Sequence, residues 1–217
     1  MPAFDRDTLT ARLHQGIETL RLDLDARQLV RLVDYLALLT KWNGVYNLTA
    51  VRDPAQMVTQ HLLDSLAVVP AFSDAHHVLD VGAGGGLPGI VLAIARPGMQ
   101  LTLVDTVQKK TAFLMQVKAE LGLANVNVHH ARVEQLKVAR KFDVITSRAF
   151  AELSDFVNWS GHLLEEGGHF IALKGVYPQD EIARLPPGWK VTQVQALQVP
   201  ELGAERHLVF IERGERA

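Results

Sequence analysis

A loop rich in glycine is the part of this sequence whose residue types and spacing most directly indicate chemistry. The stretch VLDVGAGGGLPGI, residues 78–90, contains five glycines. Its apolar start predicts a buried strand, and the glycines predict a turn whose main chain can approach a ligand closely, because no Cβ atoms stand in the way. Residues 87–95 are expected to form a helix with Pro88 in its first turn. Strand, glycine turn and helix together typically open a nucleotide-binding α/β domain.

The loop fits a binding motif in two frames. Read from Gly84 through Gly86 and Gly89, it matches G-x-G-x-x-G, the pattern of a dinucleotide site. Read from Gly82, directly after the strand, it gives G-x-G-x-G, which fits the strand end better. Asp80 favours this second frame, because a carboxylate repels a pyrophosphate but attracts the amino group and sulfonium of S-adenosylmethionine. A structural loop without a ligand is the alternative.

Charged residues end two later strands. Asp105 ends the predicted strand 101–105, near the offset of roughly 20 residues at which an acid binds ribose hydroxyls in such folds; the alternative is an N-cap for the next helix. Arg148 ends the predicted strand 142–148, at the sheet edge where open α/β sheets bind ligands. A surface salt bridge is the alternative for Arg148.

A net charge of −2 does not indicate a broad nucleic-acid-binding surface, so any RNA contact must be local. Candidate basic contacts are Arg52, Lys109, Lys110 and Lys174, and for each a solvated surface position is the alternative. Phe150 could stack on a base that is splayed out of the RNA, although a core aromatic fits the sequence equally well.

The elements that must position these residues alternate between strand and helix from about residue 76, which predicts a parallel sheet. Val133 and Glu134 fall in a loop where an adenine base would lie. Seven strands with a terminal pair favour a methyltransferase sheet over a six-stranded dinucleotide sheet. Beyond those already named, the predicted helices are 108–121 and 152–163, and the strands are 126–131, 169–175, 189–197 and 207–213.

The N-terminal third reads as helical. One helix should follow Asp25 as its N-cap and run to about Trp42, and a second should open at Asp53-Pro54 with Gln56 in the capping-box position. The polar and aromatic connection between them is expected to present contacts or to form turns. We therefore divide the chain into a helical extension, residues 1–72, and a catalytic domain, residues 73–217.

Composition limits the alternatives. The 217 residues are 48% hydrophobic, enough for one large domain or for one domain plus a small appendage. The absence of cysteine excludes disulfides, thiolate metal sites and a cysteine nucleophile. No apolar run reaches transmembrane length and the charged first residues do not predict a secretion signal. We expect a cytoplasmic protein with no metal, no membrane contact and no obligate protein partner, present as a monomer.

Five separated motifs resemble one known family. They are DVGAGGGLPGI, KWNGVYNLTAVRDP with HLLDSL after it, SRAF (residues 147–150), ALKG (residues 172–175) and VPELGAERHLVFI. Together they resemble the bacterial small-subunit ribosomal RNA guanine-N7 methyltransferases of the glucose-inhibited division B type. The resemblance covers the chain except for about its first 25 residues.

The resemblance implies a class I S-adenosylmethionine-dependent methyltransferase fold, Rossmann-like and seven-stranded with an antiparallel final strand, plus an N-terminal helical extension. It implies S-adenosylmethionine as donor and 16S ribosomal RNA, or the small ribosomal subunit particle, as partner. It places Gly82 and Leu87 near the methionine part of the donor, Val133 and Glu134 near the adenosine, and Arg148 at the donor and target pocket as the catalytic residue. With the residue arguments above, the expected donor-binding set is Asp80, Gly82, Gly84, Leu87, Asp105, Val133, Glu134 and Arg148.

The chemistry agrees with the residues that the sequence lacks. Guanine N7 carries an in-plane lone pair and can attack a sulfonium methyl without losing a proton, so no general base is required. The protein then works by positioning, and a donor such as Arg148 could read guanine O6. Two other enzymes stay open: a small-molecule O- or N-methyltransferase, which the acidic net charge favours, and an NAD-dependent dehydrogenase that uses the Gly84 frame. An RNA-binding protein without catalysis fits less well, because the donor loop is intact.

Overall fold

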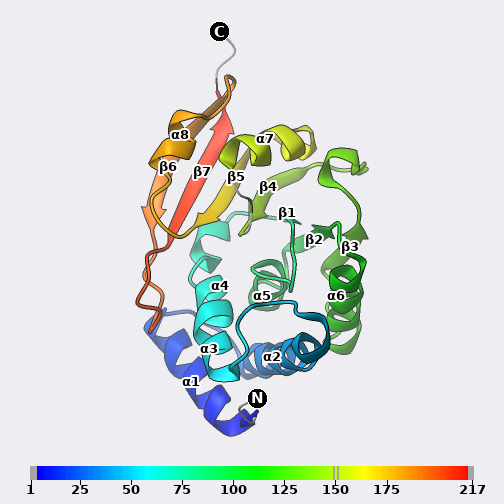
Figure 1. Cartoon of the computed structure of the whole chain (residues 1–217), viewed down its shortest axis with the longest axis vertical. Coiled ribbons are helices and arrows are strands. Elements are labelled where there is room, and N and C mark those ends of the chain that lie inside the picture. The colour runs from blue at the N-terminus through cyan, green and yellow to red at the C-terminus, as the bar shows by residue number, and fades with distance from the viewer. Residues whose placement is uncertain (1–3, 149, 151, 215–217) are drawn as a thin grey trace.

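A mixed β-sheet runs through the molecule in the computed structural model, which describes residues 4–148, 150 and 152–214. Within that part of the chain the sheet has seven strands in the order β3-β2-β1-β4-β5-β7-β6 (Figure 1). The strands are β1 (His77–Val81), β2 (Gln100–Asp105), β3 (Val126–His130), β4 (Phe142–Ser147), β5 (Leu164–Lys174), β6 (Trp189–Ala196) and β7 (His207–Arg213). β7 is antiparallel to β5 and β6, and the other ladders are parallel. The predicted methyltransferase sheet is confirmed.

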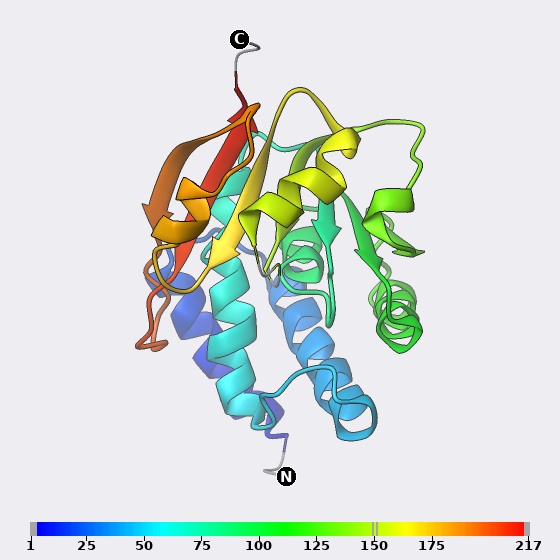
Figure 2. The same cartoon turned by 45° about the horizontal axis from the view of Figure 1, so that its top comes forward.

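Helices cover both faces of the sheet. In Figures 1 and 2 the N-terminal helices, blue to cyan, gather on one side, and α7 lies across the opposite side. The longer helices are α1 (Arg6–Thr19), α2 (Ala26–Tyr46), α5 (Gly89–Ala95), α6 (Gln108–Glu120) and α7 (Leu153–Ser160). The shorter segments are α3 (Pro54–Met57), η1 (Val58–Leu63), α4 (Asp64–Leu66), η2 (Val69–Phe72), η3 (Val133–Gln135), η4 (Gly161–Leu163) and α8 (Gln179–Ala183).

Two hydrophobic clusters form because successive strand residues point to opposite faces. In β2, Leu103 joins the cluster that contains α1 to α6, and Val104 joins the cluster packed against α7. The first cluster is one continuous set of packed side chains that includes Leu13 in α1 and Leu208 in β7. The N-terminal helices therefore share one core with the sheet rather than forming a core of their own.

The helix starts follow the sequence with two differences. Asp25 caps α2 as predicted, and its capping box closes with Gln28. Asp53 caps α3, but its side chain accepts from the Ala55 amide and forms no described capping box with Gln56. The predicted start of α5 at residue 87 is wrong: the helix begins at Gly89, with Pro88 as its N-cap. The Asp80 carboxylate accepts the Gly89 N–H and fixes the start there.

The later boundaries also shift. β4 ends at Ser147, so Arg148 lies just beyond the strand, and Ala149 of the SRAF motif is outside the described residues. α7 ends at Ser160 and continues as η4, while β5 starts at Leu164, five residues before the predicted 169. Gly167 and Gly168 therefore lie inside a strand and not in a separate connection, and α8 was not predicted.

Candidate functional site

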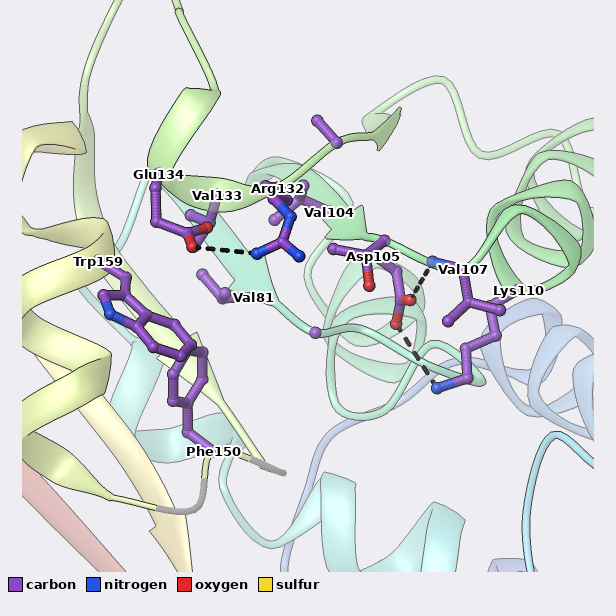
Figure 3. A pocket seen from close by; sticks show the side chains of 13 residues that line it. Val81, Val104, Asp105, Val107, Lys110, Arg132, Val133, Glu134, Phe150 and Trp159 are labelled. Carbon is purple, nitrogen blue, oxygen red and sulfur yellow. Dashed lines mark hydrogen bonds and ion pairs between the residues drawn. The ribbon is translucent and has the colours of Figure 1, made fainter.

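A first cavity of about 390 Å³ opens at the carboxyl ends of β1, β2 and β3. Figure 3 shows Asp105 and Lys110 on one side of it and the rings of Phe150 and Trp159 on the other. Its walls include the apolar side chains of Val81, Val104, Val107, Ala131 and Val133. The lining of the first cavity therefore combines apolar side chains with a few charged groups, as small-molecule sites usually do.

Asp105 holds the rim of this cavity together. Its side chain is buried, and its two oxygens accept main-chain N–H groups from Gly84 at 2.9 Å and from Val107 at 2.8 Å. Lys110 Nζ lies 3.9 Å from the same carboxylate. Val107, and not Asp105, is the N-cap residue of α6, so the alternative of a simple N-cap is wrong. Each carboxylate oxygen keeps a further lone pair with which a ribose hydroxyl could be bound.

The glycine loop leaves open space in front of β1. Gly82 has φ +67° and donates its N–H to the Val104 carbonyl at 2.9 Å. A Cβ atom added to Gly82 would meet no atom within 4 Å, whereas one added to Gly86 would lie 2.5 Å from Ile90. Gly82 lines the first cavity, so the start of the loop leaves room for a ligand. The loop packs tightly at Gly86.

Two expected donor-binding residues lie behind the loop and not on the cavity wall. Asp80 is fully buried, and only one of its oxygens has a hydrogen-bond partner among the described residues, the Gly89 N–H at 2.9 Å. Burial raises the pKa of Asp80 to about 7. Leu87 is 5% exposed and packs in the core cluster. Both support the loop from beneath, and their contact with a donor stays a prediction.

The adenosine side of the predicted site is built by η3. Val133 is buried and forms part of the cavity wall, and Glu134 follows it with an exposed carboxylate. Arg132 NH1 lies 3.8 Å from Glu134 Oε1, as the dashed line in Figure 3 shows. The structure therefore brings Gly82, Asp105, Val133 and Glu134 to one cavity, and their contact with a donor stays a prediction.

An aromatic pair closes the opposite wall. The rings of Phe150 and Trp159 meet edge to face with centroids 5.4 Å apart, and Phe150 also contacts Phe156 at 5.2 Å. Phe150 therefore lines the first cavity and also packs against the core aromatic Phe156, so it has features of both predicted alternatives. Trp159, 43% exposed, was missed, although the amphipathic pattern of α7 could have placed its ring on the solvent side.

A second cavity of about 360 Å³ opens at the carboxyl ends of β4 and β5 and contains Arg148. Arg148 NH1 lies 3.3 Å from the Gln60 carbonyl and 3.4 Å from Asp64 Oδ2. Arg206 Nε donates to Asp64 Oδ1 at 2.7 Å. Arg148 thus lies in the second cavity and is absent from the wall of the first. Asp64 and Arg206 were missed because they are distant in sequence, although both lie within the motifs HLLDSL and VPELGAERHLVFI.

His61 also lines the second cavity. Its Nε2 is 2.8 Å from Thr49 Oγ1, and its Nδ1 has no hydrogen-bond partner among the described residues. Burial, followed by the nearby Arg148 charge, lowers the pKa of His61 to about 4, so the ring is neutral at pH 7. His61 lies in η1, a π-helical turn, and such turns occur frequently at functional sites.

The other predicted RNA contacts are spread over the molecule. Arg52 is exposed and donates to Asn47 Oδ1 at 2.7 Å, and Lys109 is exposed in the first turn of α6 beside Lys110. Lys174 is largely buried, and its Nζ donates to Glu181 Oε2 at 2.7 Å and to the Phe150 carbonyl at 3.1 Å.

The first cavity fits the predicted donor. Open space in front of Gly82 and the lone pairs left on Asp105 suit a ligand with ribose hydroxyls, and the valine-rich base suits an adenine ring. Across the described ranges, no cluster of three His, Asp or Glu side chains could hold a metal ion. None of the helices described is long and apolar enough to cross a bilayer.

Solved methyltransferases share this fold. The N-methyltransferase NodS from Bradyrhizobium japonicum WM9, in complex with S-adenosyl-L-homocysteine, superposes with a TM-score of 0.56 at 14% identity, over 81% of this chain and 100% of that one. TrmN from Thermus thermophilus superposes with a TM-score of 0.54 at 18% identity, over 72% of this chain and 53% of that one. At these identities the likeness shows the fold, that of class I S-adenosylmethionine-dependent methyltransferases.

The sequence is far closer to proteins named "Ribosomal RNA small subunit methyltransferase G". It is 71% identical to the one from Herminiimonas arsenicoxydans, over 99% of this chain and 100% of the relative. It is 69% identical to the one from Janthinobacterium sp. (strain Marseille), over 98% of this chain and 99% of the relative. The sequence model of the family described as "rRNA small subunit methyltransferase G" matches residues 28–209. The chain therefore belongs to the rRNA small subunit methyltransferase G family.

Proposed function

We propose that this protein transfers a methyl group from S-adenosylmethionine to N7 of a guanine in 16S ribosomal RNA. The observation that carries the proposal is identity of 71% over 99% of the chain with a ribosomal RNA small subunit methyltransferase G. The donor is S-adenosylmethionine, which is used by the class I methyltransferases that share this fold. When bound, it supplies an electrophilic methyl group on its sulfonium.

The residues of the first cavity are proposed to hold that donor. Asp105 accepts the ribose hydroxyls with the lone pairs that the Gly84 and Val107 amides leave free. Val133 packs against the adenine, and Glu134 binds near the adenosine. Gly82 and Gly84 give the donor close access to the main chain, while Asp80 and Leu87 support the loop that carries its methionine end.

Arg148 is proposed as the catalytic residue. Guanine N7 needs no general base, so the protein accelerates transfer by holding N7 in line with the methyl group. The Arg148 guanidinium, fixed by Asp64 and the Gln60 carbonyl, can donate to guanine O6 beside N7. Its position in the second cavity supports a role toward the target base more directly than toward the donor.

The remaining proposals concern the wider molecule. We propose Arg52, Lys109, Lys110, Phe150 and Lys174 as RNA contacts, with 16S ribosomal RNA or the small ribosomal subunit particle as partner. We also propose a cytoplasmic monomer. Residues 1–72 and 73–217 are proposed as an extension and a methyltransferase domain that fold as one unit, because they share a hydrophobic core.

The test is incubation with labelled S-adenosylmethionine and ribosomal RNA that lacks the modification, followed by nucleoside analysis. We expect label in 7-methylguanosine, on free RNA or on assembled subunits. Label in another nucleoside, or label only on a small molecule, would refute the proposal. Binding of NAD without binding of S-adenosylmethionine would support the dehydrogenase instead.

A further inference from the structure

The second cavity lies next to the first along the sheet edge. The first cavity opens at β1, β2 and β3, the second at β4 and β5, and β1 pairs directly with β4. Lys174 lines the second cavity and bonds the Phe150 carbonyl, while the Phe150 ring lines the first. A group held in the second cavity therefore lies beside a donor held in the first.

Positive charge exceeds negative charge in the second cavity. Its ionised lining groups are Arg148, Arg206, Lys174 and Asp64, and Lys174 is paired with Glu181 just outside. Asp64 is 3% exposed and holds both guanidinium groups, which leaves one positive charge in excess. This balance suits an anionic ligand.

Arg206 is prepared to bind that anion. Its Nε donates to Asp64 and its NH1 to the Glu205 carbonyl, so the guanidinium plane is fixed. Within the described part of the chain its NH2 group has no acceptor, and the side chain is 28% exposed. A fixed guanidinium with unused N–H donors suits a phosphate oxygen.

His61 gives an independent sign of a ligand. Its side chain is 5% exposed and lines the cavity, and its Nδ1 has no hydrogen-bond partner among the described residues. A buried polar atom without a partner is costly unless a ligand or water satisfies it. The same π-helical segment that carries His61 leads into Asp64, so one local distortion of the helix positions both residues.

We propose that the second cavity binds the target nucleotide of the RNA, with Arg206 bound to its phosphate group and His61 facing its base. This inference rests on the proposed function. Asp64 acts as a positioning residue, because it fixes Arg206 for the phosphate and Arg148 for the base. The helical extension supplies His61 and Asp64, so it forms one wall of the target site.

The first experiment compares Arg206→Gln with the wild type and with Arg6→Gln. Arg6 is a matched control, since it pairs with Asp34 on the surface of α1. We expect Arg206→Gln to raise the KM for ribosomal RNA about tenfold, the loss of roughly one charge-assisted hydrogen bond, with S-adenosyl-L-homocysteine affinity unchanged. Arg206→Lys should recover part of the KM. An unchanged KM in Arg206→Gln would overturn the inference.

The second experiment uses the wild-type protein, so it does not depend on how a variant folds. The complex with S-adenosyl-L-homocysteine is titrated with guanosine 5′-monophosphate and with guanosine, and the His61 ring signals are followed by NMR. We expect the monophosphate to shift the His61 signals and to bind more tightly than guanosine. Equal affinity for the two, or His61 signals that do not move, would overturn the inference.

The two proposals fail in different ways. If the wild type forms no 7-methylguanosine but guanosine 5′-monophosphate still shifts His61, the proposed function is wrong and the nucleotide site remains. If 7-methylguanosine forms while Arg206→Gln behaves as the wild type, the function stands and the assignment of Arg206 is wrong.

Discussion

The two cavities are built in different ways. The first is framed by main-chain N–H groups from segments close in sequence: Gly84 and Val107 donate to the Asp105 carboxylate, and Gly82 donates to the Val104 carbonyl. The second is framed by side-chain charges, with Asp64 joined to Arg148 across 84 residues and to Arg206 across 142 residues. In the first cavity one side chain, Asp105, therefore collects main-chain donors, whereas the second depends on three charged side chains that hold one another.

Among the substitutions that separate the two cavities, Arg148→Ala should have the largest effect, and the effect should be on turnover. We expect kcat to fall about 100- to 1000-fold, because a misplaced target base loses its in-line geometry. Asp64 keeps Arg206 as a partner, so we expect the fold to persist. Donor affinity should change far less, since the guanidinium lies in the second cavity.

Single-turnover kinetics measure the rate of methyl transfer, and calorimetry with S-adenosyl-L-homocysteine measures the affinity for the donor site. Arg184→Ala is the control, because Arg184 forms an exposed ion pair with Glu152 and neither residue lines either cavity. An Arg148→Ala variant with wild-type turnover would remove Arg148 from catalysis. A donor affinity that falls as far as kcat would assign it to the first cavity.

Asp105→Asn should give the next largest effect, and it should change donor affinity and not turnover. An amide keeps the shape but turns one acceptor into a donor, which must face the N–H of Gly84 or Val107. We expect the Kd for S-adenosyl-L-homocysteine to rise about 10- to 100-fold, as for the loss of a hydrogen bond to a charged group. Asp34→Asn, on the surface of α2, is the matched control. Wild-type affinity in Asp105→Asn would show that the carboxylate does not hold the donor.

The same contrast explains what the sequence could predict. The first cavity follows from local signals: a strand, a glycine turn and an acid at the end of the next strand place Gly82 and Asp105 together. The sheet of seven strands followed from the alternation of strands and helices and from the terminal pair, but the order of the strands in space was not predicted. Both depend on neighbours in sequence, or on rules that apply to every parallel sheet.

The second cavity depends on contacts that no local pattern encodes. Asp64 reads as one polar residue within a buried helix, and nothing near it in sequence indicates that Arg206 lies beside it. The π-helical turn at η1 was also missed, because the apolar spacing around Leu62 fits an ordinary helix equally well. Lys174 was predicted as an RNA contact from its place at a strand end, but its partner Glu181 lies in α8, which was not predicted.

One buried titratable group lies at each cavity, and the two make stability depend on pH in opposite directions. Burial raises the pKa of Asp80, beneath the first cavity, to about 7. Its contribution to stability is therefore full below about pH 4 and is lost as pH rises to about 7. Burial, and then Arg148, lower the pKa of His61, at the second cavity, to about 4. Its contribution is full above about pH 6.5 and is lost as pH falls to about 4.

In the wild type these two trends oppose each other between about pH 4 and 6.5. Relative to the wild type, Asp80→Asn should become more stable as pH rises, and His61→Asn should become less stable, each by at most about 1.4 kcal/mol per pH unit. Denaturant unfolding across this range measures both slopes. Parallel curves for a variant and the wild type would show that its group does not titrate with the expected shift.

The smallest effects on RNA binding should distinguish Lys109 from Lys174, which the sequence predicts alike as RNA contacts. Lys109 is exposed, so Lys109→Gln should weaken RNA binding only a few-fold and lower the slope of log K against log salt by about 0.7 to 0.9, the loss of one phosphate contact. Lys174 is 12% exposed and is bound to Glu181, which also accepts the Leu153 N–H at the start of α7. Lys174→Gln should therefore lower the free energy of unfolding by about 2 kcal/mol and lower the salt slope by less than Lys109→Gln does, because Lys174 must give up its ion pair with Glu181 before it binds a phosphate. Filter binding at several salt concentrations, with unfolding curves for both variants, tests the pair. A salt slope that falls as far in Lys174→Gln as in Lys109→Gln would mean that the ion pair of Lys174 opens fully to RNA. An unchanged slope in Lys174→Gln would remove Lys174 from the RNA contacts.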